Sequence, residues 1–319
     1  MSLVELAIKK MQAAARGASD APVPQPPAAD RPRTVPLAEP APVVARLAPG
    51  VVGEMVSTGV HRALGSQPVE HRTDKMLLVD RRALRAAGLM PPENQERALA
   101  DQYRHIKRPL IAAATGRGGQ RLDRGQLIMM ASAMPGEGKT FTSINLALSM
   151  ALEKDISVLL VDADVPKPHI SRTFGVESEL GLLDVLRDRK TTVESVIIPT
   201  DVPNLSILPA GVRSDTATEL LASHRMEETV NHLATANPRR VVVIDSPPLL
   251  LTSESRALAH WVGQIVLVIR AGFTPQQAVM DAIAFLGENK SIGLILNQSN
   301  TATPGYYYGY GDATTVPSP

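Results

Sequence analysis

Ala133-Met134-Pro135-Gly136-Glu137-Gly138-Lys139-Thr140 is the stretch that decides the fold. It follows the apolar run Gln126 to Ser132 and precedes a helical pattern that begins near Phe141. The order strand, glycine loop, helix is that of a phosphate-binding P-loop. In such a loop, backbone N–H groups face the anion, the lysine reaches the β- and γ-phosphate oxygens and the threonine hydroxyl binds Mg²⁺. The usual pattern starts with Gly where this chain has Ala133, but the flanking strand and helix favour a P-loop over an incidental turn.

Acidic residues follow two other apolar runs. Asp162 and Asp164 come directly after Val158 to Val161, and Asp245 comes after Val241 to Ile244. A single Asp at the end of a strand is most often the N-cap of the next helix. Beside a P-loop, however, such carboxylates supply the oxygen ligands that a magnesium nucleotide needs and a group that orients or deprotonates a phosphate acceptor. The sequence therefore predicts that these side chains meet at the edge of one sheet.

Short apolar runs alternate with helical patterns through the second half of the chain. The expected strands are 126–132, 158–161, 205–208, 241–244, 265–269 and 293–296, and the expected helices include 181–187, 219–235 and 276–286. Continuous runs rich in Val and Ile are typical of parallel strands that are covered on both faces. We therefore predict an α/β fold of the P-loop NTPase type, a mostly parallel sheet with helices on both faces and ligands at the carboxyl ends of the strands.

The rest of the chain divides into extensions on either side of this domain. We expect an amphipathic helix at 1–16, a Pro/Ala-rich linker at 17–70, a small strand–helix element at 71–92, the P-loop domain at 93–300 and a flexible tail at 301–319. The amphipathic helix needs a partner, either its own protein or a membrane or second protein, and the pattern does not decide between them. Near residue 94 a further helix starts, in which Pro109 is expected to cause a kink or a fresh start.

Composition excludes several kinds of site. The chain has 319 residues, no cysteine and a net charge of +1. The absence of cysteine excludes disulfides and thiolate chemistry, and the small net charge argues against nucleic acid as the main partner. The His and Ser residues show neither metal-ligand spacing nor a glycine elbow. No run approaches the ~20 apolar residues of a membrane span, so the sequence predicts a cytoplasmic protein.

Tyrosines gather in the tail. Of the five in the chain, Tyr306, Tyr307, Tyr308 and Tyr310 lie close together among Pro and Gly residues. One interpretation is a low-complexity tail that stacks on a partner. On a chain that holds ATP and Mg²⁺, the same cluster indicates a phosphate acceptor.

These segments together resemble the bacterial tyrosine autokinases that regulate capsule and exopolysaccharide export. The resemblance covers about 98–310: the P-loop with its Pro-Gly-Glu-Gly-Lys core, the Asp-x-Asp motif at 162–164, the Asp-x-Pro-Pro motif at 245–248 and the terminal tyrosines. Leu208-Pro209-Ala210-Gly211 and Leu296-Asn297 also resemble family segments. After Asp164 the family usually has basic residues, and here that role falls to Lys167 behind Pro166.

The resemblance implies roles for individual residues. Lys139 stabilises charge on the γ-phosphoryl group, Asp162 receives or orients the tyrosine proton, and Thr140, Asp164 and Asp245 hold Mg²⁺, with the roles of the first two aspartates open to exchange. The residues implied in nucleotide binding are Pro135, Gly136, Glu137, Gly138, Lys139, Thr140, Phe141 and Asn297.

The resemblance also implies partners. Asp101, Arg104 and Lys107 resemble the family's self-association motif, Glu-x-x-Arg-x-x-Arg, which implies a ring-like homo-oligomer. The Lys107-Arg108-Pro109-Leu110 continuation and the long N-terminus resemble the exosortase-associated subgroup. Further expectations are a separate transmembrane polysaccharide co-polymerase as activator, a tyrosine phosphatase, and a peripheral position at the inner membrane through the partner.

Two other functions remain open at this stage. A partitioning-type switch ATPase of the same fold is disfavoured because those enzymes resemble one another in a signature lysine where this chain has Met134. A nucleotide-binding scaffold that regulates its membrane partner without transferring phosphate is the second.

Overall fold

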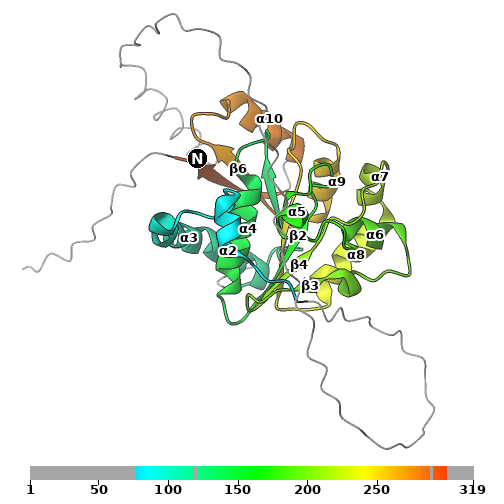
Figure 1. The fold of residues 1–319 in the computed structure, drawn as a ribbon. Helices are drawn as coiled ribbons and strands as arrows, with labels where there is room; N and C mark the ends of the chain where they lie inside the picture. Colours follow the sequence, from blue (N-terminus) through cyan, green and yellow to red (C-terminus); the bar gives the residue numbers. More distant parts are fainter. Residues whose placement is uncertain (1–75, 118, 120, 288–289, 300–319) are drawn as a thin grey trace, which may run out of the picture. The chain divides into compact units, whose positions relative to one another are not determined.

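The computed structural model describes residues 76–117, 119, 121–287 and 290–299 (Figure 1). The predicted amphipathic helix, the linker and the tyrosine tail all lie outside these residues. Within them, no helix is both long enough and apolar enough to cross a membrane.

A seven-stranded sheet forms the centre of the domain, with the strand order β3-β4-β2-β5-β1-β6-β7. Its strands are β1 (Leu127–Ser132), β2 (Ser157–Asp162), β3 (Ile198–Pro199), β4 (Leu205–Leu208), β5 (Arg240–Asp245), β6 (Gln264–Arg270) and β7 (Ser291–Asn297). All pairs are parallel except β3 with β4. The prediction of a mostly parallel P-loop NTPase-type sheet is confirmed. The antiparallel edge strand β3 was missed, because two residues are too few to give a pattern.

Helices cover both faces of this sheet. The helices are α2 (Arg81–Ala86), α3 (Glu96–Thr115), α4 (Lys139–Ala151), α5 (His169–Thr173), α6 (Leu182–Arg187), α7 (Ala217–Leu221), α8 (His224–Thr235), α9 (Glu254–Trp261) and α10 (Gln276–Leu286), with the 3₁₀ turns η1 (Glu93–Gln95) and η2 (Val193–Val196). Helix α4 packs on β1, β2 and β5, and α3 packs on α4 (Figure 1). On these strands the alternate residues Ile128, Met130, Val158 and Leu160 share one hydrophobic core with α3 and α4. The residues between them are buried as well, so both faces are covered, as the unbroken apolar runs predicted.

The expected helix 219–235 is wrong in one respect, since it is two helices. Helix α7 ends before Ala222, and Ser223 is the N-cap of α8, its hydroxyl accepting from the Met226 N–H at 3.3 Å. Serine offers its hydroxyl to backbone groups at helix ends, which is why a helix starts afresh there.

Helix α3 continues through Pro109 without a fresh start. Pro109 is exposed, so the carbonyl that loses its helical partner can bond to water. The buried face carries Tyr103, Lys107 and Leu110. Ahead of this helix, the Asp80 side chain accepts from the N–H groups of Arg82 and Ala83 and caps α2.

Candidate active site

The P-loop joins β1 to α4 and turns through glycines in left-handed conformations. Gly138, the N-cap of α4, has φ 90°. A Cβ placed there would lie 2.0 Å from the Asn297 side-chain nitrogen, so a larger residue would strain the backbone and push Asn297 away from the Glu137 carbonyl to which it donates. Helix α4 starts at Lys139, two residues before the expected start.

Glu137 braces the loop from inside. Its side chain is buried, and one carboxylate oxygen accepts from the Met134 N–H at 2.7 Å while the other accepts from the Thr274 hydroxyl. The Asn297 side chain donates to the Glu137 carbonyl at 2.9 Å. The loop is therefore fixed to the ends of β6 and β7. Thr274 belongs to no motif, so no sequence pattern pointed to it, and it comes near the loop only through the fold.

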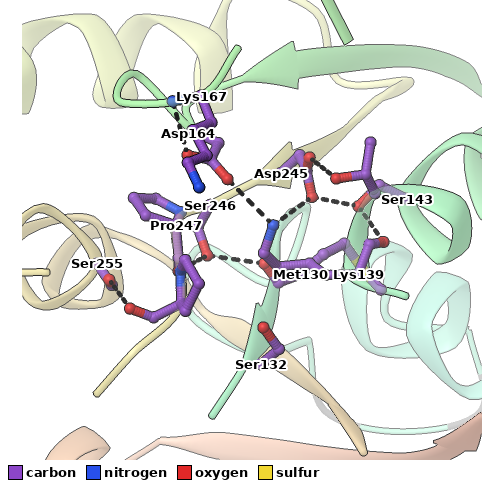
Figure 2. Close-up of polar contacts among 12 residues, drawn as sticks. Met130, Ser132, Lys139, Ser143, Asp164, Lys167, Asp245, Ser246, Pro247 and Ser255 are labelled. Atoms are coloured by element: carbon purple, nitrogen blue, oxygen red, sulfur yellow. Dashed lines mark hydrogen bonds and ion pairs between the residues drawn. The ribbon is translucent and has the colours of Figure 1, made fainter. Parts of the chain in front are cut away.

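The Lys139 ammonium lies between two carboxylates from different strands (Figure 2). Its Nζ is 3.3 Å from Asp245 Oδ1 and 3.5 Å from Asp164 Oδ2. All three side chains are buried. Burying a charge is costly unless it is paired, so each of these groups depends on the other two.

Asp245 collects further donors from the first turn of α4. Its Oδ2 accepts from the Thr140 hydroxyl at 2.8 Å. Its Oδ1 accepts from the Ser143 hydroxyl, also at 2.8 Å (Figure 2). Ser143 is a site residue that the sequence analysis missed. Its position four residues after Lys139, on the same helix face, is the signal that could have found it.

The turn after β5 holds Asp245 against the P-loop strand. The Ser246 hydroxyl donates to the Met130 carbonyl at 2.8 Å (Figure 2). The Leu249 N–H donates to the Ser132 carbonyl at 2.8 Å. Pro247 and Pro248 have no N–H to donate, and the bonds on either side of them fix the path of the chain away from the sheet.

Asp162 is buried in a different way. Its Oδ2 accepts from the N–H and the hydroxyl of Ser171, each at 2.7 Å, while its buried Oδ1 has no hydrogen-bond partner. Burial raises the pKa of Asp162 to about 7, aided by the negative charges of Asp245 and Asp164 and opposed by the bonds from Ser171. Burial also raises the pKa of Asp164, against the opposing charge of Lys139.

The oxygen-rich edge suits a small hard cation. Lys139 is flanked by Asp164 and Asp245, and the Thr140 hydroxyl donates to Asp245. Asp162 adds a buried oxygen, Oδ1, that has no hydrogen-bond partner. In the part of the chain that the structure describes, no three acidic or histidine side chains form a closed metal cage. Mg²⁺ is commonly held by one or two carboxylates with water and substrate phosphates, so this donor set fits it.

Other predicted residues occupy different places. Pro135 and Gly136 are exposed at the tip of the loop, and Phe141 is half-buried on α4. Asp101 and Arg104 form an exposed ion pair. Lys107 turns inward instead, where its Nζ lies 2.7 Å from the Ser149 carbonyl and 2.7 Å from Glu153. The three residues of the self-association motif thus do not share one exposed surface.

Tyr103, the tyrosine outside the tail cluster, is a core residue. It is 5% exposed. Burial raises the pKa of its phenol, against the smaller effect of a hydrogen bond to the Thr142 side chain. A buried phenol is out of reach of a phosphoryl donor, so Tyr103 is not an acceptor in the folded protein.

Comparison with known proteins gives consistent matches. The sequence profile of a family described as an AAA domain matches residues 125–286. The tyrosine-protein kinase YwqD of Bacillus subtilis is 31% identical over 214 residues, which are 66% of this chain and 86% of that protein. The tyrosine-protein kinase wzc of Salmonella typhimurium is 30% identical over 188 residues, 58% of this chain but 26% of that longer protein.

A solved structure also matches. The kinase domain of VpsO is 30% identical, with a TM-score of 0.54, and the match covers 66% of this chain and all of that domain, 100%.

Proposed function

Because the chain belongs to the family of bacterial tyrosine-protein kinases with an AAA domain, we propose that it transfers the γ-phosphoryl group of ATP to the tyrosines at 306–310 of a neighbouring copy. The observation that carries the proposal is the position of the Lys139 ammonium between Asp164 and Asp245. The next residue, Thr140, adds a hydroxyl that donates to Asp245. A P-loop lysine beside carboxylates and a hydroxyl suits binding of a magnesium nucleotide.

Each residue has a defined task in this proposal. Lys139 leaves its carboxylate partners and neutralises the γ-phosphate oxygens. Thr140, Asp164 and Asp245 would hold Mg²⁺, which when bound would supply positive charge beside the transferring phosphoryl group. Glu137 and Asn297 keep the loop in shape.

Asp162 is the proposed proton acceptor. A pKa of about 7 suits a general base at neutral pH. The Asp162 side chain is fully buried, so Asp164 is an alternative proton acceptor. Two variants distinguish the roles of these aspartates. Asp162→Asn should lower kcat and remove the acidic limb of the pH–rate profile, whereas Asp164→Asn should raise the Mg²⁺ concentration at half-maximal rate. The opposite pattern would exchange the two roles.

The biological setting is part of the proposal. By analogy with its relatives we propose a ring-like homo-oligomer, ATP and Mg²⁺ as cofactors, a role in exopolysaccharide polymerisation or export, and membership of the exosortase-associated subgroup. A separate transmembrane co-polymerase would activate the kinase and hold it at the inner membrane, and a tyrosine phosphatase would reverse the modification. Clustered phosphotyrosines, at about −1.5 to −2 charges each, would repel one another and release the tail from a neighbour's acidic site.

Intact mass spectrometry of the purified protein with ATP and Mg²⁺ tests the reaction. Phosphate should appear on the tail cluster and not on the buried Tyr103. Lys139→Met should abolish the gain, and Lys154→Met, the same chemical change at an exposed site, should not. Far-UV circular dichroism of each variant checks that it is folded. Labelling that persists in folded Lys139→Met protein refutes the mechanism, and an unchanged tail mass with the activator present favours the scaffold function.

A further inference from the structure

Strand β7 is the last strand of the sheet among the described residues, and its side chains are exposed or half-buried along its whole length. The Asn297 carbonyl accepts from the Ala271 N–H at 2.9 Å, so the backbone polar groups of Asn297 point toward β6. This direction alternates along a strand. The N–H and C=O groups of Leu296, Leu294 and Ile292 therefore point to the open side, where an added strand would pair.

A pocket of about 250 Å³ lies at the start of this strand. Arg124, Lys290, Ser291 and Asp123 are among the residues that line it, giving a net positive charge. The Lys290 Nζ is held by the carbonyls of His260 and Val262 at 3.0 and 2.9 Å. Burial and the neighbouring charge of Arg124 lower the pKa of Lys290. An anion bound in the pocket would raise this pKa again.

The tail has the length to reach this pocket along the open side of β7. An antiparallel return needs a loop after Leu296, and Gln298 already has the left-handed φ of 55° that turns favour. A four-residue loop at 297–300 would put Thr301 opposite Leu296 and Tyr306 opposite Ser291.

Pro304 restricts the register further. It has no N–H, so it must lie opposite a β7 residue that points toward β6 rather than to the open side. The four-residue loop meets this condition, with Pro304 opposite Gly293. Longer loops that also put Pro304 opposite a residue pointing toward β6 would place Tyr308 or Tyr310 opposite Ser291. Every such register therefore brings a tyrosine of the cluster to the positively charged pocket.

We propose that the phosphorylated tail of the same chain pairs antiparallel with β7 and places the phosphate of Tyr306 in the pocket formed by Arg124 and Lys290. The proposal rests on the proposed function for the origin of the phosphate. Without phosphate, the loss of conformational freedom of a Gly-rich segment outweighs the pairing. In the phosphorylated tail, charge-assisted bonds from Arg124 and Lys290 to the phosphate offset this loss, and the docked tail is withheld from a neighbour's active site.

The test separates this inference from the kinase activity. The full chain is produced with phosphotyrosine encoded at position 306 and is studied without ATP. Amide hydrogen exchange by NMR should slow about tenfold or more at Ile292, Leu294 and Leu296, relative to the unmodified chain. Equal exchange in the two proteins refutes the proposal. Slowing that appears only as the protein concentration rises assigns the docking to a second copy and overturns pairing within the chain.

Variants locate the contacts. Gly305→Pro would put a proline opposite the open-side residue Ile292 in the proposed register, and should restore fast exchange. Arg124→Met and Lys290→Met should do the same, whereas Lys154→Met should not. If the encoded phosphotyrosine slows exchange but ATP adds no phosphate to the wild-type chain, the proposed function fails while the docking stands.

Discussion

Asp162→Asn offers a quantitative test of the site's electrostatics. The pKa of Asp162 is raised from 3.8 to about 7 by burial. A carboxyl that holds its proton more tightly in the folded protein contributes stability below its unfolded pKa, and this contribution is lost as pH rises through the folded pKa. Three pH units at about 1.4 kcal/mol each give about 4 kcal/mol from this one group.

Urea unfolding between pH 4.5 and 8, without nucleotide or Mg²⁺, measures the effect. The free energy of unfolding of the wild type minus that of Asp162→Asn should fall by about 1.4 kcal/mol per pH unit up to about pH 7, and then level off. Subtracting the mutant removes the contributions of all other groups, provided that they are unchanged.

Asp155→Asn is the matched control. Asp155 is exposed, and its hydrogen bond from Arg117 lowers its pKa, so its difference curve should move slightly in the opposite direction. A difference for Asp162 that is constant with pH, or that rises with pH, would refute the reasoning that this carboxyl is held neutral by burial.

Two further predictions concern the P-loop and the self-association motif. Gly138→Ala should weaken nucleotide binding measured by calorimetry, because its Cβ would displace the Asn297 side chain from the Glu137 carbonyl. Gly88→Ala, at φ 70° in open space, should leave binding intact and cost only about 1 kcal/mol of stability. Lys107→Met should lower the melting temperature without changing the oligomer measured by light scattering, because Lys107 bonds within its own chain. Arg104→Glu, at an exposed position, should change the oligomer. Loss of the oligomer in folded Lys107→Met protein would contradict this assignment.

Local patterns predicted the sheet and the P-loop well, because their signals are short-range. The run 127–131 is apolar throughout, and Gly138 followed by Lys139 stands where the loop after this strand enters the helix. The Val-rich run before Asp245 likewise gave its strand to within one residue at each end. Such signals depend on side-chain period and backbone freedom, which neighbouring residues determine.

Short-range patterns did not predict which polar side chains point into the protein. Lys107 reads as a surface cation in a helical motif, yet it is buried against the Ser149 carbonyl. Thr274 stands in no motif and still contacts Glu137. Asp162 and Asp164 look equivalent in sequence, but Asp164 pairs with Lys139 whereas Asp162 bonds to Ser171.

The sequence by itself determined the fold class, the loop that faces phosphate and the carboxylates at the strand ends. It did so because hydrophobic period, glycine backbone freedom and the parallel sheet bring those positions to one edge. Only the tertiary structure decided which two carboxylates pair with Lys139, how far burial raises the pKa of Asp162, and which glycine lies against the side chain of Asn297. These properties depend on distances between segments far apart in the chain and on how much water each group loses on folding.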